Sequence, residues 1–341
     1  DSLTVPVFIV NPEGTLIFYN EPAEEILGKK FEDTGPMPVT DWGTSFFPQD
    51  EDGKDLAPEE LPLVQTIKNK VPAHKTFWIK ALNGTYGGNT PCIEIINGEE
   101  RIIVDAGTGI LGIDFDSFYK SDRIDILLTH LHMDHIQGLA FCKPLFNPNK
   151  EIHIWGPGGS PESLQSRLNR FLSPPLFPIP LRDIPCNLII EELPNTSFTL
   201  GNFLITSEFI SHPGPTVGFR IQCGSKSVTY MPDHEPVIGK AHLFPENDWV
   251  SGFRLAYQSD LLIHDSQYSK KEYMNKVGWG HSSLDIAAEY CSRTEAKHLV
   301  LFHHDPAHSD EERTQMFENF TRKSNYDFPI ELAVQGHEIE I

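Results

Sequence analysis

From residue 75 onward, apolar residues occur in short runs closed by turn-forming residues, a pattern typical of β-strands. Gly98, Gly201 and Gly224 stand where consecutive runs reverse direction, so hairpins are expected there. The predicted strands are Cys92–Ile96, Arg101–Asp105, Ile124–Leu128, Glu151–Trp155, Phe203–Ser207, Val217–Ile221, Ser227–Met231, Leu261–His264 and His298–Phe302.

Segments with helical periodicity lie between these strands. The clearest is Ser282–Thr294, in which apolar residues recur on one face. Ser282 with Asp285 three residues later predicts capping of its first turn. Hairpin strands that alternate with helices favour sheets covered by helices over a doubly wound parallel sheet.

The first 75 residues follow a different pattern. The apolar runs Val7–Val10 and Thr15–Tyr19 flank a turn and predict a hairpin. Helices are predicted over Glu21–Leu27 and Leu63–Lys70, separated by a stretch rich in proline and acidic residues. We therefore predict two domains, residues 1–75 and 76–341.

Charge and cysteine content narrow the class of function. The formal net charge of -21 disfavours nucleic acid as a partner, because a phosphate backbone is bound by clustered lysine and arginine. No run of about 18 apolar residues occurs, so no membrane span is expected. The five cysteines are scattered and lack CxxC spacing, which suits reduced thiols and a cytoplasmic location.

The main candidate for chemistry is the segment Thr129–His135, which reads Thr-His-Leu-His-Met-Asp-His at the end of a predicted strand. His130, His132, Asp134 and His135 place four metal-ligating side chains within six residues. A chance match to this pattern is expected on the order of 0.002 times per chain. A single catalytic metal is satisfied by three protein ligands, so four in one loop indicate two metals that share a water.

Three later residues repeat the context of an apolar run next to a nitrogen or oxygen ligand. They are His212 before Val217–Ile221, Asp233 after Val228–Met231, and His303 after Leu299–Phe302. His304 stays open as an alternative to His303, which is preferred because it directly ends the run. Nitrogen and oxygen donors without a thiolate are compatible with zinc, manganese or iron.

These motifs, with Gly87–Thr90, Val104–Gly109 and Gly280–Ser282, resemble the metallo-β-lactamase superfamily, and within it the ribonuclease Z-like and cyclic phosphodiesterase branch. The resemblance covers roughly residues 76–341 and includes every metal position. It implies an α+β fold class, an αββα sandwich with the metals at one edge. The smaller N-terminal domain would be a separate α+β unit.

The resemblance also implies roles for single residues. One divalent ion would be held by His130, His132 and His212, the other by Asp134, His135 and His303, with Asp233 bridging the two. His281 would act as general acid, and Asp134 is expected to take part in catalysis as well as in binding. For Asp265 an orienting role and a plain strand-end carboxylate stay open, as do a substrate wall and a buried linker for Phe171–Pro185.

The N-terminal segment, Val7–Gly14 followed by Ile17–Gly28, resembles the opening of a PAS domain. The resemblance covers roughly residues 1–75 and implies either dimerisation, giving a homodimer, or binding of a small ligand.

The expected function is hydrolysis of small phosphodiesters, including cyclic nucleotides, by a hydroxide that bridges the two metals. Hydrolysis of a lactone or thioester by the same centre is an alternative, and a non-catalytic sensor with the metals as its binding site is another. Oxygen-binding diiron relatives carry glutamate in an HxExD pattern, and His132 stands at that position here. This difference favours hydrolysis.

Overall fold

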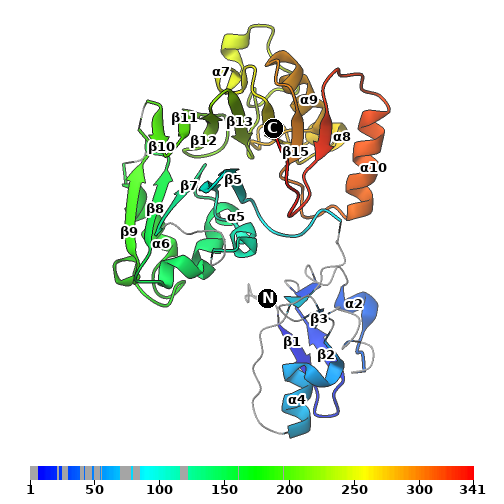
Figure 1. The fold of residues 1–341 in the computed structure, drawn as a ribbon. Helices are drawn as coiled ribbons and strands as arrows, with labels where there is room; N and C mark the ends of the chain where they lie inside the picture. Colours follow the sequence, from blue (N-terminus) through cyan, green and yellow to red (C-terminus); the bar gives the residue numbers. More distant parts are fainter. Residues whose placement is uncertain are drawn as a thin grey trace. The chain divides into compact units, whose positions relative to one another are not determined.

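The computed structural model describes residues 7–20, 23–24, 30–38, 42, 48–49, 54, 56–69, 78–79, 85–115, 122–159, 161–194 and 196–341. The chain divides into two compact units, residues 1–88 and 89–341 (Figure 1). The domain boundary predicted near residue 75 lies outside the described residues and stays a prediction.

The N-terminal unit contains the predicted hairpin, in which β1 (Phe8–Val10) pairs antiparallel with β2 (Leu16–Tyr19). The second predicted helix is present as α4 (Pro62–Asn69), whereas the helix predicted over Glu21–Leu27 lies largely outside the described residues. The other elements of the unit are α2 (Phe31–Thr34), β3 (Pro48–Gln49), η1 (Pro58–Glu60) and β4 (Trp78–Ile79). Its apolar core consists of Leu16, Tyr19, Ala23, Trp42, Leu56 and Leu61.

The larger unit is built on two sheets, of which the first has five strands in the order β5-β6-β7-β8-β9. β5 and β6 form an antiparallel hairpin, and the strands from β6 to β9 are parallel. The strands are β5 (Ile93–Asn97), β6 (Glu100–Val104), β7 (Arg123–Leu127), β8 (Glu151–Gly156) and β9 (Asn187–Glu192).

The second sheet has seven strands in the order β10 to β16, antiparallel from β10 to β13 and parallel from β13 to β16. Its strands are β10 (Phe198–Leu200), β11 (Phe203–Phe209), β12 (Val217–Cys223), β13 (Lys226–Met231), β14 (Leu261–Asp265), β15 (Leu299–Phe302) and β16 (Ile330–Leu332). Because parallel strands end at the same edge, the carboxyl ends of β13, β14 and β15 lie side by side. This edge carries the candidate ligands.

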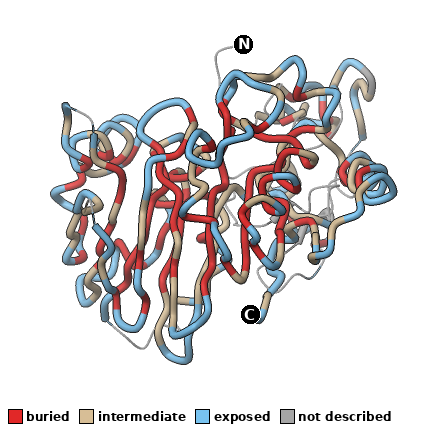
Figure 2. Tube along the Cα trace, turned by 90° about the horizontal axis from the view of Figure 1, so that it is seen from above, coloured by how far each residue is buried: buried red, intermediate tan, exposed pale blue. Residues whose placement is uncertain are grey.

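Alternation along the strands produces two apolar layers. On β6, Ile102 and Val104 belong to the core between the sheets, whereas Ile103 belongs to the core on the outer face of the first sheet. Helix α6 (Leu164–Phe171) packs into that outer core, and α9 (Leu284–Arg293) packs on β14 and β15 of the second sheet. Figure 2 shows the burial that results, with buried residues concentrated in the interior of the larger unit and exposed residues along its outer loops.

The remaining elements connect the strands, and all of them are short except α10, which has 12 residues. They are η2 (Thr108–Gly112), α5 (Met133–Ile136), η3 (Gln137–Phe141), η4 (Lys143–Phe146), η5 (Leu181–Asp183), η6 (Asn247–Trp249), α7 (Phe253–Ala256), α8 (Lys270–Tyr273) and α10 (Asp310–Thr321).

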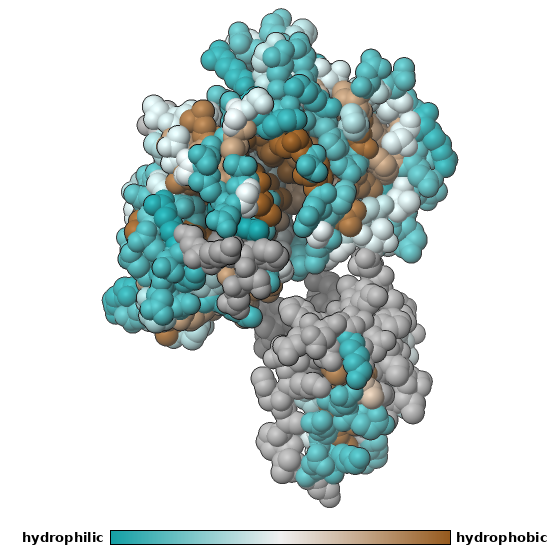
Figure 3. Space-filling view, in the orientation of Figure 1, coloured by the Kyte–Doolittle hydropathy of each residue, from teal (hydrophilic) through white to brown (hydrophobic). Residues whose placement is uncertain are grey.

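The face of the molecule drawn in Figure 3 is mostly hydrophilic, and apolar atoms show mainly in a hollow in the middle of the larger unit. This distribution agrees with the acidic composition. Among the described helices, none is both long and apolar enough to cross a bilayer.

In the larger unit the predicted strands are present with ends shifted by one or two residues, but three of its strands were not predicted; β3 and β4 of the N-terminal unit were not predicted either. β9, β10 and β16 lie at or next to the sheet edges, where a strand needs less apolar character. The predicted cap of α9 is also wrong. Ser283 caps the helix by accepting from the amide of Ile286, and the hydroxyl of Ser282 donates to the carbonyl of His234 instead.

Candidate metal centre

Strand ends from both sheets bring the seven predicted ligands to one place. β7 runs into the segment 128–136, in which α5 begins directly after His132. In the second sheet, Asp233 follows β13 and His303 follows β15, while His212 lies between β11 and β12. Residues that are far apart in the sequence meet because their strands end at the same edge.

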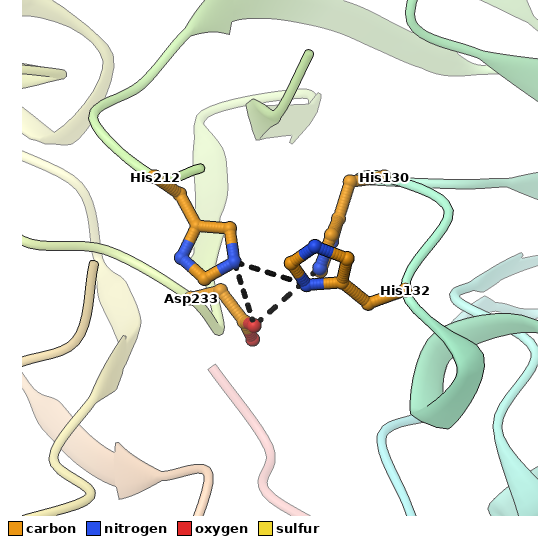
Figure 4. A group of neighbouring side chains, drawn as sticks. All are labelled: His130, His132, His212 and Asp233. Atoms are coloured by element: carbon orange, nitrogen blue, oxygen red, sulfur yellow. Dashed lines mark hydrogen bonds and ion pairs between the residues drawn. The ribbon is translucent and has the colours of Figure 1, made fainter. Parts of the chain in front are cut away.

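One group of possible ligands consists of His130, His132, His212 and Asp233, whose ligand atoms all lie within 4.8 Å of one another. The Nε2 atom of His212 lies 3.2 Å from Nδ1 of His132. The Oδ2 atom of Asp233 lies 3.5 Å from Nε2 of both His130 and His212. Figure 4 shows these side chains converging on a common centre, which we call the first metal position.

A second group consists of Asp134, His135 and His303, again within 4.8 Å. The Oδ2 atom of Asp134 lies 3.4 Å from Nε2 of His135 and 3.3 Å from Nε2 of His303. His303 has a φ of 60°, a left-handed conformation that turns the chain as soon as β15 ends. We call this group the second metal position.

Asp233 contributes to both positions through different oxygens. Its Oδ2 atom faces the first metal position, whereas Oδ1 lies 3.1 Å from Nε2 of both His135 and His303. The side chain is only 2% exposed, so the protein holds it on every side. This geometry is the one expected of a carboxylate that bridges two cations.

The structure separates His303 from His304. The ring of His303 faces the carboxylates of the second metal position. In contrast, Nε2 of His304 donates to the carbonyl of Ala333, 3.0 Å away. His303 is therefore the residue that the fold directs into the centre.

The donor atoms fit divalent cations. Nε2 of His130, Nε2 of His135 and Oδ1 of Asp233 are buried and make no hydrogen bond within the described part of the chain. A buried polar atom without a hydrogen bond costs roughly 1–3 kcal/mol, and cations at the two positions would satisfy all three atoms. The donor set contains nitrogen and oxygen but no thiolate, which suits zinc, manganese or iron. The number and identity of the ions stay predictions.

The electrostatics of the centre also favour cations. Burial raises the pKa of Asp233, but the imidazoles of His303 and His135 lower it well below its usual range. Burial lowers the pKa of His135, but the carboxylates of Asp233 and Asp105 raise it well above its usual value. Burial likewise lowers the pKa of His303, and Asp233 and Asp134 raise it to about 9. The centre thus contains buried negative charge that a cation would balance.

Asp105 holds one of the ligands directly. This carboxylate is fully buried and accepts from the amide and hydroxyl of Thr129, at 2.8 and 2.9 Å. Its Oδ2 atom accepts from Nδ1 of His135 at 2.8 Å, which leaves Nε2 of that ring for a metal. Asp105 lies in the motif Val104–Gly109, and its contact with His135 is a finding of the structure.

Asp265, at the end of β14, contacts His281, and both residues lie within 4.8 Å of ligand atoms of Asp233 and His303, in a third group that could hold a metal ion. Its Oδ2 atom accepts from Nδ1 of His281 at 2.7 Å, and Oδ1 accepts from the amide of Ser282 at 2.9 Å. The ring of His281 lies 5.0 Å from that of His212 and 5.1 Å from that of His303, between centroids. Burial lowers the pKa of His281, but Asp265 raises it above its usual value. His281 therefore lies beside both metal positions.

Two further predicted features have a different place. In the segment 171–185, Leu172, Phe177 and Leu181 are buried in the outer core of the first sheet, as expected of a buried linker, and its role as a substrate wall stays a prediction. His234 was assigned no role from the sequence. Its Nδ1 atom lies 2.9 Å from Nε2 of the buried His264, next to the centre.

The fold and this centre agree with the family match. The profile of the family described as "Beta-lactamase superfamily domain" matches residues 100–304, more than half of the chain. The chain therefore belongs to this family, in the metallo-β-lactamase superfamily. It is a metal-dependent hydrolase with the mixed α/β fold of that superfamily, as the sequence predicted.

Individual relatives support the same class. The ribonuclease Z of Thermococcus gammatolerans is 25% identical over 256 residues, which cover 63% of this chain and 78% of that protein. The structure of the metallo-beta-lactamase fold protein YhfI from Bacillus subtilis is similar in fold, with a TM-score of 0.53, 20% identity and coverage of 75% of this chain and 95% of that one. A diphosphatase from the PhnP family gives a TM-score of 0.50 at 17% identity, covering 74% and 84%.

One prediction about partners is not supported. The net charge of -21 disfavoured nucleic acid, yet the matched relatives include proteins named ribonuclease Z. Total charge sums over the whole surface and says little about one site, so it cannot exclude an RNA substrate.

Proposed function

We propose that the chain is a dinuclear phosphodiesterase that acts on small phosphodiesters, including cyclic nucleotides. The observation that carries this proposal is the single carboxylate of Asp233, whose two oxygens face two separate ligand groups. When bound, two divalent ions would stabilise the negative charge of a phosphoryl group and lower the pKa of a water that they share. The protein has to hold the ligands and supply a proton to the leaving group.

His281 is the residue placed to supply that proton. Its Nδ1 atom donates to Asp265, so Nε2 is the atom that can transfer a proton to the leaving oxygen. The ring lies against His212 and His303, one from each metal position. Asp134 is the second catalytic candidate, because its side chain is 39% exposed at the centre whereas that of Asp233 is 2% exposed.

The proposal is tested first with a substrate panel. Metal-loaded full-length protein should hydrolyse bis(p-nitrophenyl) phosphate, and cyclic nucleotides should be turned over faster than lactones or thioesters. The panel also includes a structured RNA, because relatives of this chain are named ribonuclease Z and RNA is therefore a candidate substrate. Lactone hydrolysis with inert phosphodiesters would reject the proposal, and cleavage of RNA alone would restrict it to nucleic acid.

The second test replaces the proton donor. His281→Ala should leave the metal content intact and lower turnover by roughly 10²- to 10⁴-fold, the usual effect of removing one acid–base group. The loss should be greater for an alkoxide leaving group than for p-nitrophenolate, which scarcely needs a proton. His298→Ala is the matched control, since His298 precedes β15 at the end remote from His303 and pairs with Glu331. Loss of metal from the His281 variant would instead make His281 a ligand.

For the N-terminal unit we propose a PAS-like fold that dimerises the protein or binds a small ligand. The antiparallel hairpin of β1 and β2 and the apolar core around Tyr19 and Trp42 support this proposal. Light scattering of the full chain checks the dimerisation, because a homodimer would have twice the 38.5 kDa mass of one chain.

A further inference from the structure

Glu235, two residues after the shared ligand Asp233, is a fully buried carboxylate to which the sequence gave no role. Four donors from three parts of the chain converge on it. Its Oε1 atom accepts from the amides of Gly239 and Gly278, at 3.0 and 2.8 Å, and from the hydroxyl of Tyr273 at 3.0 Å. Its Oε2 atom accepts from the amide of Gly280 at 2.9 Å.

The nature of these donors explains why a carboxylate stands here. An ionised carboxylate only accepts, so two oxygens can serve all four donors at once. A glutamine would replace one oxygen with an amide NH₂, and this NH₂ would face an N–H or O–H donor without an acceptor between them. The side chain of Glu235 therefore matches a turn that presents several backbone N–H groups in one direction.

The turn 278–281 that Glu235 holds also contacts a ligand of the first metal position. The carbonyl of Gly280 accepts from Nδ1 of His212 at 2.8 Å. This hydrogen bond places the proton of the ring on Nδ1 and leaves Nε2 for a cation. A side chain at residue 280 does not fit, because a Cβ there would lie 2.6 Å from Nδ1 of His212 and 2.3 Å from Cδ of Pro213.

Glu235 holds the other side of His212 as well. Its backbone amide donates to the carbonyl of Ser211 at 3.0 Å. The backbone of Glu235 thus fixes Ser211, just before the ligand His212. Its side chain fixes Gly280, whose carbonyl accepts from the ring of His212. His281 follows Gly280 directly, so the same turn also sets the backbone of the candidate proton donor.

We propose that Glu235 is a positioning residue that directs Nε2 of His212 into the first metal position and fixes the backbone of His281. The proposal rests on the assignment of the two metal positions, and it does not depend on which substrate the enzyme takes. It makes the first metal position dependent on Glu235 and leaves the second, which Asp105 supports, independent of it.

The experiment is a calorimetric titration of metal-free full-length protein with Zn²⁺, analysed for two classes of site. Glu235→Gln should weaken one class by roughly 10- to 100-fold, the usual effect of losing a residue that supports a metal ligand, and leave the other unchanged. Tyr273→Phe removes one donor and keeps the three glycine amides, so it should shift the same class in the same direction by less. This milder variant keeps the test decisive if Glu235→Gln does not fold.

Asp260→Asn is the matched control. Asp260 accepts from the amide of Ser227 and from Lys297 at the opposite end of β13 and β14, so it removes a carboxylate from the same sheet away from the centre. It should change neither class. Histidine ¹⁵N NMR adds a readout that does not depend on metal, since the proton of His212 should no longer be held on Nδ1 in Glu235→Gln.

Equal weakening of both classes, or an NMR spectrum unchanged in both the Glu235 and Tyr273 variants, would overturn the proposal. If the Zn²⁺ pattern is as expected and no phosphodiester is hydrolysed, the positioning role stands and the proposed function fails.

Discussion

The two metal positions share Asp233 but hold their histidines in different ways. At the second position, His135 donates directly to the buried carboxylate of Asp105. At the first, His212 donates to a backbone carbonyl, that of Gly280, whose turn is in turn held by Glu235. The ring of His135 therefore donates directly to a carboxylate. The ring of His212 donates to a carbonyl, and the turn that carries this carbonyl is held by the carboxylate of Glu235. Glu235 and Asp105 thus support different imidazoles, so a change at either residue should weaken one metal position more than the other.

The pKa values of the histidines also differ between the two metal positions. Burial is the largest cause that lowers the pKa values of His130, His132 and His212 at the first position. At the second position, carboxylates outweigh burial and raise the pKa values of His135 and His303. The first position thus has three imidazoles and one carboxylate, that of Asp233, whereas the imidazoles of the second lie between the carboxylates of Asp134, Asp233 and Asp105.

The largest effect is expected where the two positions are not separable. Asp233→Ala removes an oxygen from each ligand group, so both positions should weaken and turnover should fall by at least about 10³-fold, equivalent to roughly 4 kcal/mol of transition-state stabilisation. Elemental analysis and kinetics of the full-length protein check this. Two bound metals per chain and retained activity in this variant would show that Asp233 does not bridge the two positions.

A more selective effect is expected at the second position. Asp105→Asn leaves a single oxygen, which can serve Thr129 or His135 but not both. The ring of His135 then faces either an NH₂ or a neutral oxygen and in both cases loses its charged acceptor. Asparagine tolerates the left-handed backbone of residue 105, whose φ is 61°, so backbone strain is avoided. Metal affinity should fall by roughly 10- to 100-fold at the second position. The first position should weaken less, because its His130 reaches Asp105 only through the hydroxyl of Thr129. The Zn²⁺ titration checks this prediction: the class of site that weakens more in Asp105→Asn must be the class that Glu235→Gln leaves unchanged.

The sequence predicted some residues of this centre and missed others, and the difference depends on where each residue lies along the chain. The loop from His130 to His135 is local, so its composition alone indicated metals. Asp233 and His303 were found because a ligand that directly follows an apolar run is a recognisable pattern. The structure brings all of these residues together.

The supporting residues could not be predicted in the same way. The carboxylate of Glu235 binds backbone amides, and Gly280 supports His212 through its backbone carbonyl. Backbone partners carry no residue-specific signal in one sequence. Similarly, the parallel halves of the two sheets depend on crossovers between distant segments, and the local hairpin signals showed only the antiparallel halves. The sequence thus predicted the groups that face the metals better than the groups behind them.

The smallest expected effect separates a clash at the first metal position from simple backbone strain. Gly278 and Gly280 both have a φ of 90°, so replacing either with alanine strains the turn by a similar amount, of order 1–3 kcal/mol. Only Gly280→Ala also forces a Cβ against His212 and Pro213, because the nearest atom to a Cβ at residue 278 is the Cα of Gly239, at 3.9 Å. Both variants should therefore lose thermal stability, measured by calorimetry, and Gly280→Ala should lose at least as much as Gly278→Ala. Gly280→Ala alone should also weaken Zn²⁺ binding at the first position, by about tenfold. Equal Zn²⁺ affinities in the two variants would mean that the turn can move without moving His212, and the first position would then be as self-supporting as the second.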